Sequence, residues 1–178
     1  FRFNIGYLAN WTFITMSSEL RVDKIIPTAG VPTGGGGGIV QVKQAVHTEY
    51  VKFNTSSFSA GTMAGGGAGN YQITITPKFA TSKILVSFNC SYDNNTSNQR
   101  MNVTIYRGTS TNLGGGNGFC NIWNPDQRIQ GVATAQYLDS PATTSAVTYH
   151  VYGKVSTGDG YLGLYDDHKW MHAMEVSA

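Results

Sequence analysis

The residues that titrate closest to neutral pH are the four histidines, and their spacing decides whether they could hold a metal or move a proton. None of them belongs to an HExxH motif or to a His-x-His pair. The nearest approach to a ligand set for a divalent ion is Asp166, Asp167 and His168, followed by His172. The alternative, which we favour, is a solvated turn followed by a strand whose histidine packs beside Trp170.

Nucleophilic and acid–base catalysis leave no signature in the chain either. The many serines and threonines include no Gly-x-Ser-x-Gly elbow. A glycosidase needs two placed carboxylates, whereas the ten acidic residues show no pairing in the sequence. The scattered candidates are Glu49, Asp93, Asp126, Asp139 and Glu175. We therefore expect a protein that is not an enzyme, with no catalytic residue, no metal site and no cofactor.

The composition narrows the class of partner. Charged residues make up 12% of the 178 residues, about half the ~25% usual in soluble domains, and 22 glycines with many Thr, Ser and Asn fill the difference. The formal net charge of +2, without a basic cluster, is too small for a nucleic-acid binder. The sequence contains no run of about 18 apolar residues, so we expect no membrane insertion.

Two cysteines, Cys90 and Cys120, have neither CxxC spacing nor a neighbouring histidine. A disulfide between two strands and a pair of free buried thiols are both compatible with this pattern. Free thiols are the interpretation that we favour, because an isolated cysteine often behaves as a small buried apolar residue.

Residues 76–92 contain the clearest β-strand of the chain. Apolar and polar side chains alternate there, and the apolar set is Ile84, Val86, Phe88, Cys90 and Tyr92. Leu85 interrupts the polar face, which indicates a central strand that is partly covered on both sides.

The same alternation recurs along the rest of the chain. Further strands are predicted at residues 39–53, 71–76, 101–108, 119–128, 131–141, 147–155 and 169–178. In the first of these stretches we expect Val40 and Val42 to point inward. Residues 56–70 and 93–100 are predicted to form an irregular loop and a long turn.

About eight to ten short strands without an amphipathic helix predict an all-β fold, an antiparallel β-sandwich of jelly-roll-like architecture. A sheet protein with few surface charges must hide its edges, so we expect a closed homo-oligomer. The pure glycine run at residues 34–38 lacks the Gly-Lys-Ser/Thr ending of a phosphate loop and is interpreted as a hinge. The predicted organisation is an extended N-terminal attachment arm at residues 1–33, the hinge at residues 34–38, and the head domain at residues 39–178.

Several aromatic side chains fall at strand ends or on faces that the alternation assigns outward. They are Tyr106, Trp123, Tyr152, Tyr161 and Tyr165. Aromatic rings beside Asn, Asp and Gln suit contact with sugars or proteins. The alternative, which we favour for most of them, is packing against another subunit.

Five phrases follow one another in the sequence: MSSELRVDKIIPTAGVP before the glycine run, ITPKFATSKILVSFN, IYRG, YLDSPATTSAVTYHVY and a terminal MEVSA. Together they resemble a family of tailed-bacteriophage virion proteins, especially from marine and freshwater, cyanophage-like viruses. The likeness covers most of the chain from Met16 onward. It rests on the order of the phrases rather than on a catalytic signature.

The resemblance implies a virion protein of the tail-fibre or receptor-binding type, in which an N-terminal arm attaches to the particle and a β-domain, commonly a trimer, projects outward. The alternative is a capsid decoration or head-fibre protein attached to the shell. The resemblance places Leu20, Val22 and Ile25 in the attachment arm. Family members begin at the equivalent of Met16, so residues 1–15 are either translated upstream sequence or an extension that docks into another virion protein. The density of aromatic side chains favours docking. These side chains include Phe3, Tyr7, Trp11 and Phe13.

Loops of the head domain are the expected place of contact with a host-surface glycan or protein. The loops are residues 94–99, 112–118 and 157–160. The candidate receptor-contact residues are Asn95, Asn98, Asn117, Trp123, Asp159 and Tyr161. The predicted location of the protein is the virion, at the tail fibre or on the capsid surface.

Overall fold

The computed structural model describes residues 38–164 and 169–177. The predicted arm, most of the predicted hinge and the Asp166-Asp167-His168 sequence lie outside the described residues. So do all the predicted attachment residues and one of the predicted outward aromatics, namely Phe3, Tyr7, Trp11, Phe13, Leu20, Val22, Ile25 and Tyr165.

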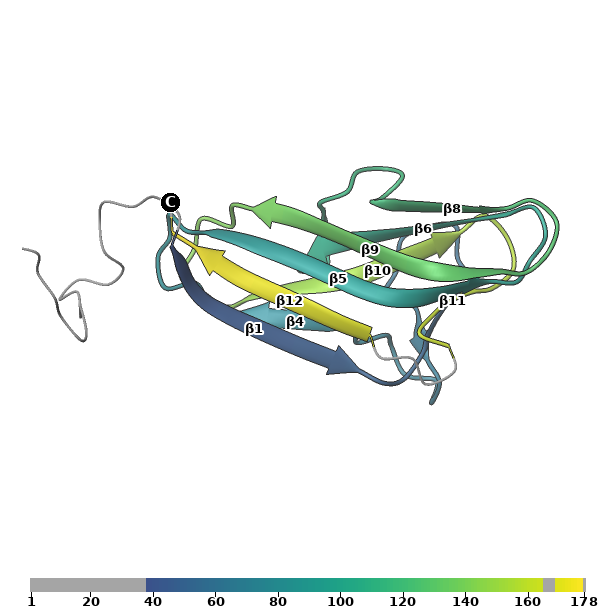
Figure 1. The fold of residues 1–178 in the computed structure, drawn as a ribbon, viewed down its shortest axis with the longest axis horizontal. Helices are drawn as coiled ribbons and strands as arrows, with labels where there is room; N and C mark the ends of the chain where they lie inside the picture. Colours follow the sequence, from purple (N-terminus) through teal and green to yellow (C-terminus); the bar gives the residue numbers. More distant parts are fainter. Residues whose placement is uncertain (1–37, 165–168, 178) are drawn as a thin grey trace, which may run out of the picture. The chain divides into compact units, whose positions relative to one another are not determined.

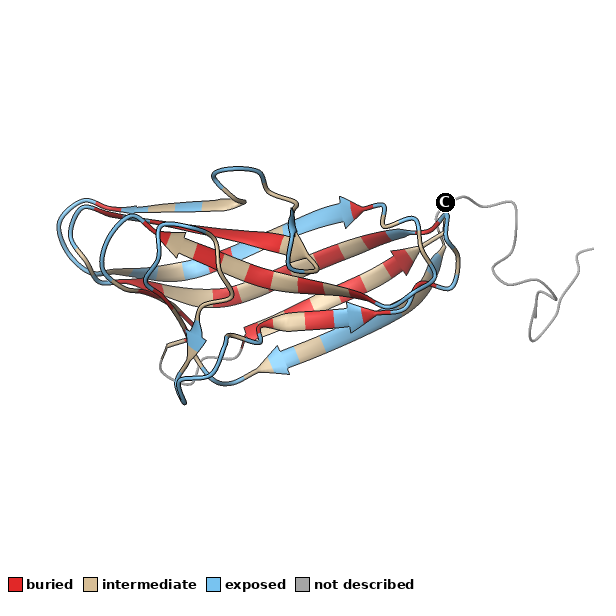
Figure 2. Cartoon of the chain, turned by 180° about the vertical axis from the view of Figure 1, so that it is seen from behind, coloured by how far each residue is buried: buried red, intermediate tan, exposed pale blue. Residues whose placement is uncertain are grey.

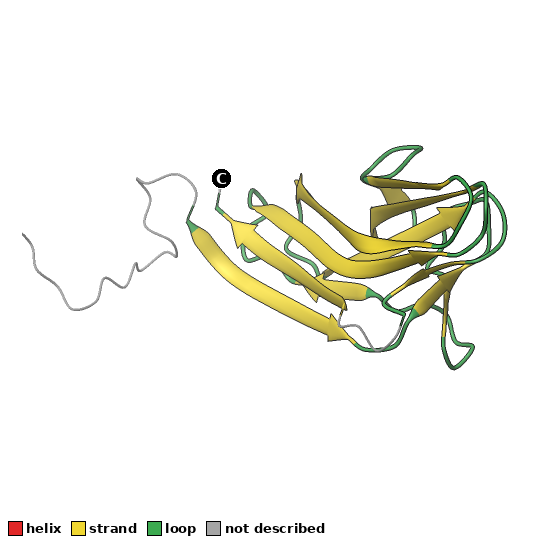
Figure 3. Cartoon of the chain, turned by 45° about the vertical axis from the view of Figure 1, so that its right-hand side comes forward, coloured by secondary structure: helices red, strands yellow, loops and turns green. Residues whose placement is uncertain are grey.

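Twelve β-strands form the regular structure of the described residues, and no helix is present among them (Figures 1 and 3). The strands are β1 Ile39–His47, β2 Val51–Phe53, β3 Thr62–Met63, β4 Gln72–Ile75, β5 Lys83–Asn94, β6 Gln99–Arg107, β7 Thr111–Asn112, β8 Cys120–Asn124, β9 Ile129–Asp139, β10 Val147–Val155, β11 Gly160–Leu162 and β12 Lys169–Val176. The prediction of an all-β fold is confirmed. The part of the chain that the structure describes therefore offers no helix that could cross a membrane.

The strands form two antiparallel sheets. Sheet A has the order β1-β12-β5-β11-β2-β3, and β9 pairs with the other side of β5. Sheet B has the order β4-β10-β6-β7, and β8 also pairs with β6. The long strands β1-β12-β5-β9 thus lie over β4-β10-β6-β8 (Figure 1), which is the strand order of a jelly roll. The predicted antiparallel, jelly-roll-like sandwich is confirmed, and β5 is central as Leu85 indicated.

The core lies between the sheets and follows the alternation of the strands. Figure 2 shows buried positions alternating with more exposed ones along β5, β10 and β12, whereas β6 is buried throughout from Met101 to Ile105. The predicted inward faces are buried on both sheets, from Ile84, Val86 and Phe88 to Met101 and Val103. Because the side-chain period of a strand is two, the opposite residues of these strands form two outer faces.

The prediction for β1 is wrong at Val42. This side chain is 55% exposed and pairs with Met174 on the outer side of sheet A. The register of β1 against β12 shifts between Ile39 and Gln41. Such a bulge places two residues opposite one and exchanges the two faces of the strand beyond it. Gln41, rather than Val42, consequently turns inward.

Two further predictions need correction. The predicted loop at residues 56–70 contains the short strand β3, which pairs with β2. The predicted long turn at residues 93–100 is only four residues long, because β5 continues to Asn94 and β6 begins at Gln99, and both of these side chains are buried. The expectation of free thiols is confirmed, although Cys120 is only half-buried.

Three buried carboxylates tie strands together. Glu175 of β12 accepts hydrogen bonds from Gln41 Nε2 at 2.6 Å and from the backbone N–H of Lys78 at 2.8 Å. Asp139 of β9 accepts from the guanidinium of Arg107 and from the hydroxyl of Tyr149. The third, Asp93 of β5, accepts hydrogen bonds from Arg128 and Gln130. Since each carboxylate is held by donors from elsewhere in the chain, these groups fix the sandwich rather than form a catalytic pair.

Candidate functional site

The outer face of sheet B, called the sheet-B face below, carries the polar and cationic side chains that strand register brings together. Its members are Gln72 and Thr74 of β4, Arg100, Asn102, Thr104 and Tyr106 of β6, Asn121 and Trp123 of β8, Thr148, His150, Tyr152 and Lys154 of β10, and the following Ser156. At one end of this face Lys154 lies opposite Asn102, and Ser156 lies opposite Arg100. Diagonal neighbours on a sheet are about 7–8 Å apart, so the two cations occupy one small area.

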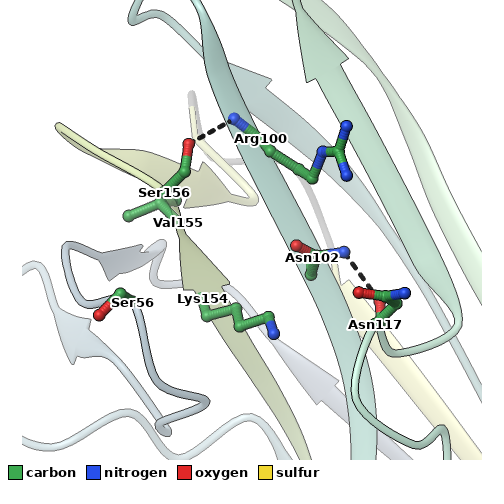
Figure 4. A pocket seen from close by; sticks show the side chains of 7 residues that line it. All are labelled: Ser56, Arg100, Asn102, Asn117, Lys154, Val155 and Ser156. Carbon is green, nitrogen blue, oxygen red and sulfur yellow. Dashed lines mark hydrogen bonds between the residues drawn. The ribbon is translucent and has the colours of Figure 1, made fainter.

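A pocket of about 340 Å³ opens over these two rows (Figure 4). It is lined by Ser56, Arg100, Asn102, Asn117, Lys154, Val155 and Ser156. Asn102 is only 4% exposed, whereas Ser56, Arg100, Asn117 and Ser156 are exposed. The volume falls at the lower end of the ~300–1,000 Å³ usual for small-molecule sites.

The connection between β7 and β8 forms one wall of the pocket. The backbone carbonyl of Asn117 accepts a hydrogen bond from Asn102 Nδ2 at 2.8 Å, and the carbonyl of Gly116 accepts one from Lys154 Nζ at 2.7 Å. Gly118 allows the chain to return to the sheet, because its φ is +68° and a Cβ there would lie 2.5 Å from the carbonyl oxygen of Val103. The wall is thus held by the same two side chains that line the pocket.

The two cations of the pocket rest on aromatic rings. The guanidinium carbon of Arg100 lies 5.6 Å from the ring centre of Trp123, and Lys154 Nζ lies 4.5 Å from that of Phe58. Among the described residues, no carboxylate forms an ion pair with either cation. Arg107 and Lys52, in contrast, pair with aspartates at 3.0 and 2.8 Å. The pocket therefore presents positive charge that no described side chain neutralises.

An aromatic group continues the sheet-B face beyond the pocket. The rings of Tyr106 and Tyr152 stack with centroids 4.4 Å apart and an interplanar angle of 26°. Phe58 packs against Tyr106 at 6.2 Å, and His150 packs against Tyr152 at 5.8 Å. Burial lowers the pKa of His150, so its imidazole is uncharged at neutral pH. Three of the predicted outward aromatics, Tyr106, Trp123 and Tyr152, thus lie on one face.

The structure brings together only some of the predicted receptor-contact residues. Asn117 lines the pocket, and the half-exposed indole of Trp123 lies under Arg100. Asn95 and Asn98 are exposed in the turn between β5 and β6, where Asn98 adopts a φ of +55°.

Asp159 lies in the turn between β10 and β11, Tyr161 lies in β11 of sheet A, and neither residue lines the pocket. Asp159 pairs with Lys52 at 2.8 Å, and the ring of Tyr161 packs edge-on against Tyr50 at 5.8 Å. Tyr161 lies opposite Asp93 of β5 in the register of sheet A.

Of the six candidates only Asn117 lines the pocket. The turn that holds Asn95 and Asn98 lies against the turn before Asp159, because a Cβ added to Gly158 would collide with Thr96 Oγ1.

The outer face of sheet A, called the sheet-A face below, has a different character. Three rows of side chains cross β1, β12, β5 and β9. None of these twelve residues is charged when the imidazole of His172 is neutral. The rows are Val42-Met174-Leu85-Leu138, Gln44-His172-Ser87-Gln136 and Val46-Trp170-Asn89-Thr134. The two edges of this face are the most exposed, with Val42 at 55% and Leu138 at 48%. An exposed apolar row at both edges is typical of a surface that contacts another molecule.

The titratable groups among the described residues offer little acid–base or metal chemistry. No group of three or more His, Cys, Asp or Glu in the described ranges could hold a metal ion. Burial raises the pKa of the Cys90 thiol to about 12, so this sulfur stays protonated and is a poor nucleophile. His172 lies on the sheet-A face with its ring 4.6 Å from that of Trp170, which is the packing that the plainer interpretation of the sequence expected.

The sequence matches no known protein family model. A search among curated proteins also finds no match. What the chain does must therefore be inferred from its two faces and from the resemblance described above.

Sequence reasoning missed most of the pocket. The sequence predicts a long turn at Arg100 and gives no signal that Lys154 and Ser56 line a pocket with this residue. The alternation of Met101, Val103 and Ile105, extended back by one position, does place Arg100 on the outer face. The pairing of β6 with β10, which alone brings Lys154 beside it, leaves no signal in a single sequence.

Proposed function

We propose that this chain is a non-enzymatic virion protein of a tailed phage, a tail-fibre or receptor-binding component whose head domain recognises the host surface. The observation that carries the proposal is the contrast between the two outer faces: three rows of the sheet-A face carry no charged residue, whereas the sheet-B face is cationic and aromatic and holds a pocket. The order of sequence phrases that resembles phage virion proteins supports the proposed location of this chain on the virus particle. A fibre head needs one surface for assembly and another for its receptor, and the two faces suit these roles.

The sheet-A face supports the proposal of a homo-oligomer. None of its twelve positions holds a charged side chain. Charged residues are likewise depleted from the core of protein interfaces. Two edge strands of the sheet are β1 and β9, and each carries exposed apolar side chains. A head-to-tail contact between copies closes into a ring when the rotation allows it. We propose a trimer, the number that the resemblance implies.

The proposed attachment to the particle rests on the sequence of the N-terminal arm. The aromatic residues of positions 1–15 and the apolar residues of positions 20–25 are the proposed contacts with other virion proteins. A capsid decoration or head-fibre protein would use the same arm and the same oligomer, so the location on the particle separates the two roles.

Antibody-gold labelling of purified particles, viewed by electron microscopy, tests this proposal. Label on the tail or its fibres is the expected result. Label spread over the capsid would replace host recognition by the decoration role, and particles without label would overturn both. A second preparation made with the arm removed should lose the label, while the separate head domain keeps its fold by circular dichroism.

A further inference from the structure

We propose that the pocket between Arg100 and Lys154 binds a saccharide that carries a carboxylate, of the uronic acid or sialic acid kind. The inference deepens the proposed host recognition and rests on it for its biological setting. The pocket itself is defined by Arg100, Asn102, Asn117, Lys154 and Ser156, which lie on or beside the sheet-B face (Figure 4).

Charge is the first reason for an anionic ligand. Arg100 and Lys154 stand on adjacent strands at the pocket, and no Asp or Glu is among the residues that line it. Lys154 uses one of its three N–H groups on the carbonyl of Gly116, which leaves two for a ligand. The planar guanidinium of Arg100 presents a fork that matches a carboxylate. A single carboxylate held between the two cations would neutralise both.

Hydroxyl recognition is the reason for a saccharide. Asn102 and Asn117 each carry an amide that can donate and accept, and Ser56 and Ser156 each carry a hydroxyl. Such groups match the mixed donors and acceptors of sugar hydroxyls. A pocket built for an inorganic anion alone would not need them, and its volume of about 340 Å³ exceeds what one small anion requires.

The aromatic rings at the rim fit the same class of ligand. Trp123 lies beneath Arg100, and Phe58 lies beneath Lys154, so each cation is held in place by a ring rather than by a carboxylate. The exposed part of Trp123, 48% of the residue, offers an apolar surface to a second sugar ring. Nucleic acid fits less well, because affinity for a phosphate backbone grows with the number of phosphates contacted and the pocket offers only two cations.

The test is a titration of the full chain with methyl glycosides of glucuronic, galacturonic and sialic acid, followed by ligand-observed NMR and calorimetry. Each acid is paired with its methyl ester, which has the same shape without the charge. We expect at least one acid to bind, and its ester to bind at least about tenfold more weakly. No binding of any acid at about 10 mM, or equal binding of the ester, would overturn the inference.

Two matched pairs of variants localise the binding. Arg100→Gln and Asn117→Asp should each weaken binding of the acid by at least about tenfold, the second because it places a negative charge at the rim. Two control variants outside the pocket, Lys83→Gln, which also removes a cation, and Asn70→Asp, which makes the same change from amide to carboxylate, should leave binding unchanged. Thermal unfolding checks that all four variants fold. Unchanged affinity in the two folded pocket variants would contradict the site. If inorganic phosphate competes for the pocket as effectively as the saccharide does, the pocket is an anion site only and the saccharide inference is wrong.

The outcomes separate this inference from the proposed function. If fluorescent wild-type chain labels host cells and Arg100→Gln labels them equally, the saccharide site is wrong and host recognition stands. If the chain binds the saccharide but particles carry the protein only on the capsid, the site stands and the tail-fibre role is wrong.

Discussion

The two outer faces of the sandwich share one core and one strand period, yet they differ in every chemical property that governs contact. The sheet-A face has no charged residue in its twelve central positions, and apolar side chains line both of its edges. The sheet-B face concentrates two cations, several amides and a stacked aromatic group. Uncharged, partly apolar faces favour burial against another protein, whereas unneutralised cations favour a soluble, charged ligand. This difference is the reason for the proposal that one face serves assembly and the other recognition.

The largest loss of stability is expected from a change in the core between the two sheets, because both outer faces depend on its packing. A Cβ added to Gly153 of β10 would lie 2.7 Å from ring atoms of the buried Phe53. Gly153→Val should therefore destabilise the domain by about 3 kcal/mol and abolish both assembly and binding. Denaturant unfolding measures the loss. Gly65→Val is the matched control, because the space around Gly65 is open and its stability should stay near that of the wild type.

A charge on the sheet-A face should separate assembly from folding. Val42 is exposed in the single chain, so Val42→Glu leaves the domain folded but buries an unpaired carboxylate in the proposed contact. The association constant should fall by about 100-fold or more. Sedimentation velocity would show monomers in place of the oligomer. Thr74 is an exposed position on β4 of sheet B, so Thr74→Glu should assemble as the wild type does. Dissociation of this variant would refute the assignment of faces.

The attachment of β1 to the sheet-A edge should depend on pH. Burial alone would raise the pKa of Glu175, but hydrogen bonds from Gln41 and from the backbone of Lys78 and Phe79 outweigh it and hold the pKa below 4.5. A lowered pKa stabilises the fold at pH values above 4.5, and this stabilisation disappears as the pH falls through the lower value in the folded state. Glu175→Gln should cost about 1.5–3 kcal/mol at pH 7.

Unfolding curves between pH 7 and pH 2 supply the check on Glu175. The difference in stability between wild type and Glu175→Gln should shrink steadily below pH 4.5. A difference that stays constant across this range would show that the carboxylate charge contributes nothing.

The smallest effect concerns the aromatic group of the sheet-B face. Tyr106 and Tyr152 stack at 4.4 Å, which predicts a coupling of about 0.5–1.5 kcal/mol between them. A double-mutant cycle with Tyr106→Ala and Tyr152→Ala measures this term. Assembly should not change in either variant, and a coupling near zero would mean that the two rings merely adjoin.

The sequence predicted the class of fold because alternation is a local signal. Ile84, Val86 and Phe88, or Met101 and Val103, reveal their buried face without knowledge of any partner strand. The face of β1 was mispredicted because a single bulged residue inverts the pattern after it. The length of the β5–β6 turn was overestimated because Asn94 and Gln99 are polar residues that are nevertheless buried.

The candidate site was less accessible to sequence reasoning. Arg100 and Lys154 are distant in the chain and meet only through the register of β6 against β10. Ser56 comes from a third segment, the loop after β2. Asn117 and Trp123 are exposed polar and aromatic residues, and nothing in the local sequence separates them from Asp159 and Tyr161, which pair with Lys52 and lie opposite Asp93 of sheet A, respectively. A composite site of this kind depends on long-range pairing.

Hydrogen–deuterium exchange on the edge strands tests the assignment of the two faces most directly. The edges of sheet A include β1 and β9, and those of sheet B include β4 and β8. At concentrations where the wild type assembles and Val42→Glu does not, amides of β1 and β9 should exchange more slowly in the wild type, with β4 and β8 unchanged. Equal exchange of β1 and β9 in both proteins, or protection confined to β4 and β8, would contradict the account.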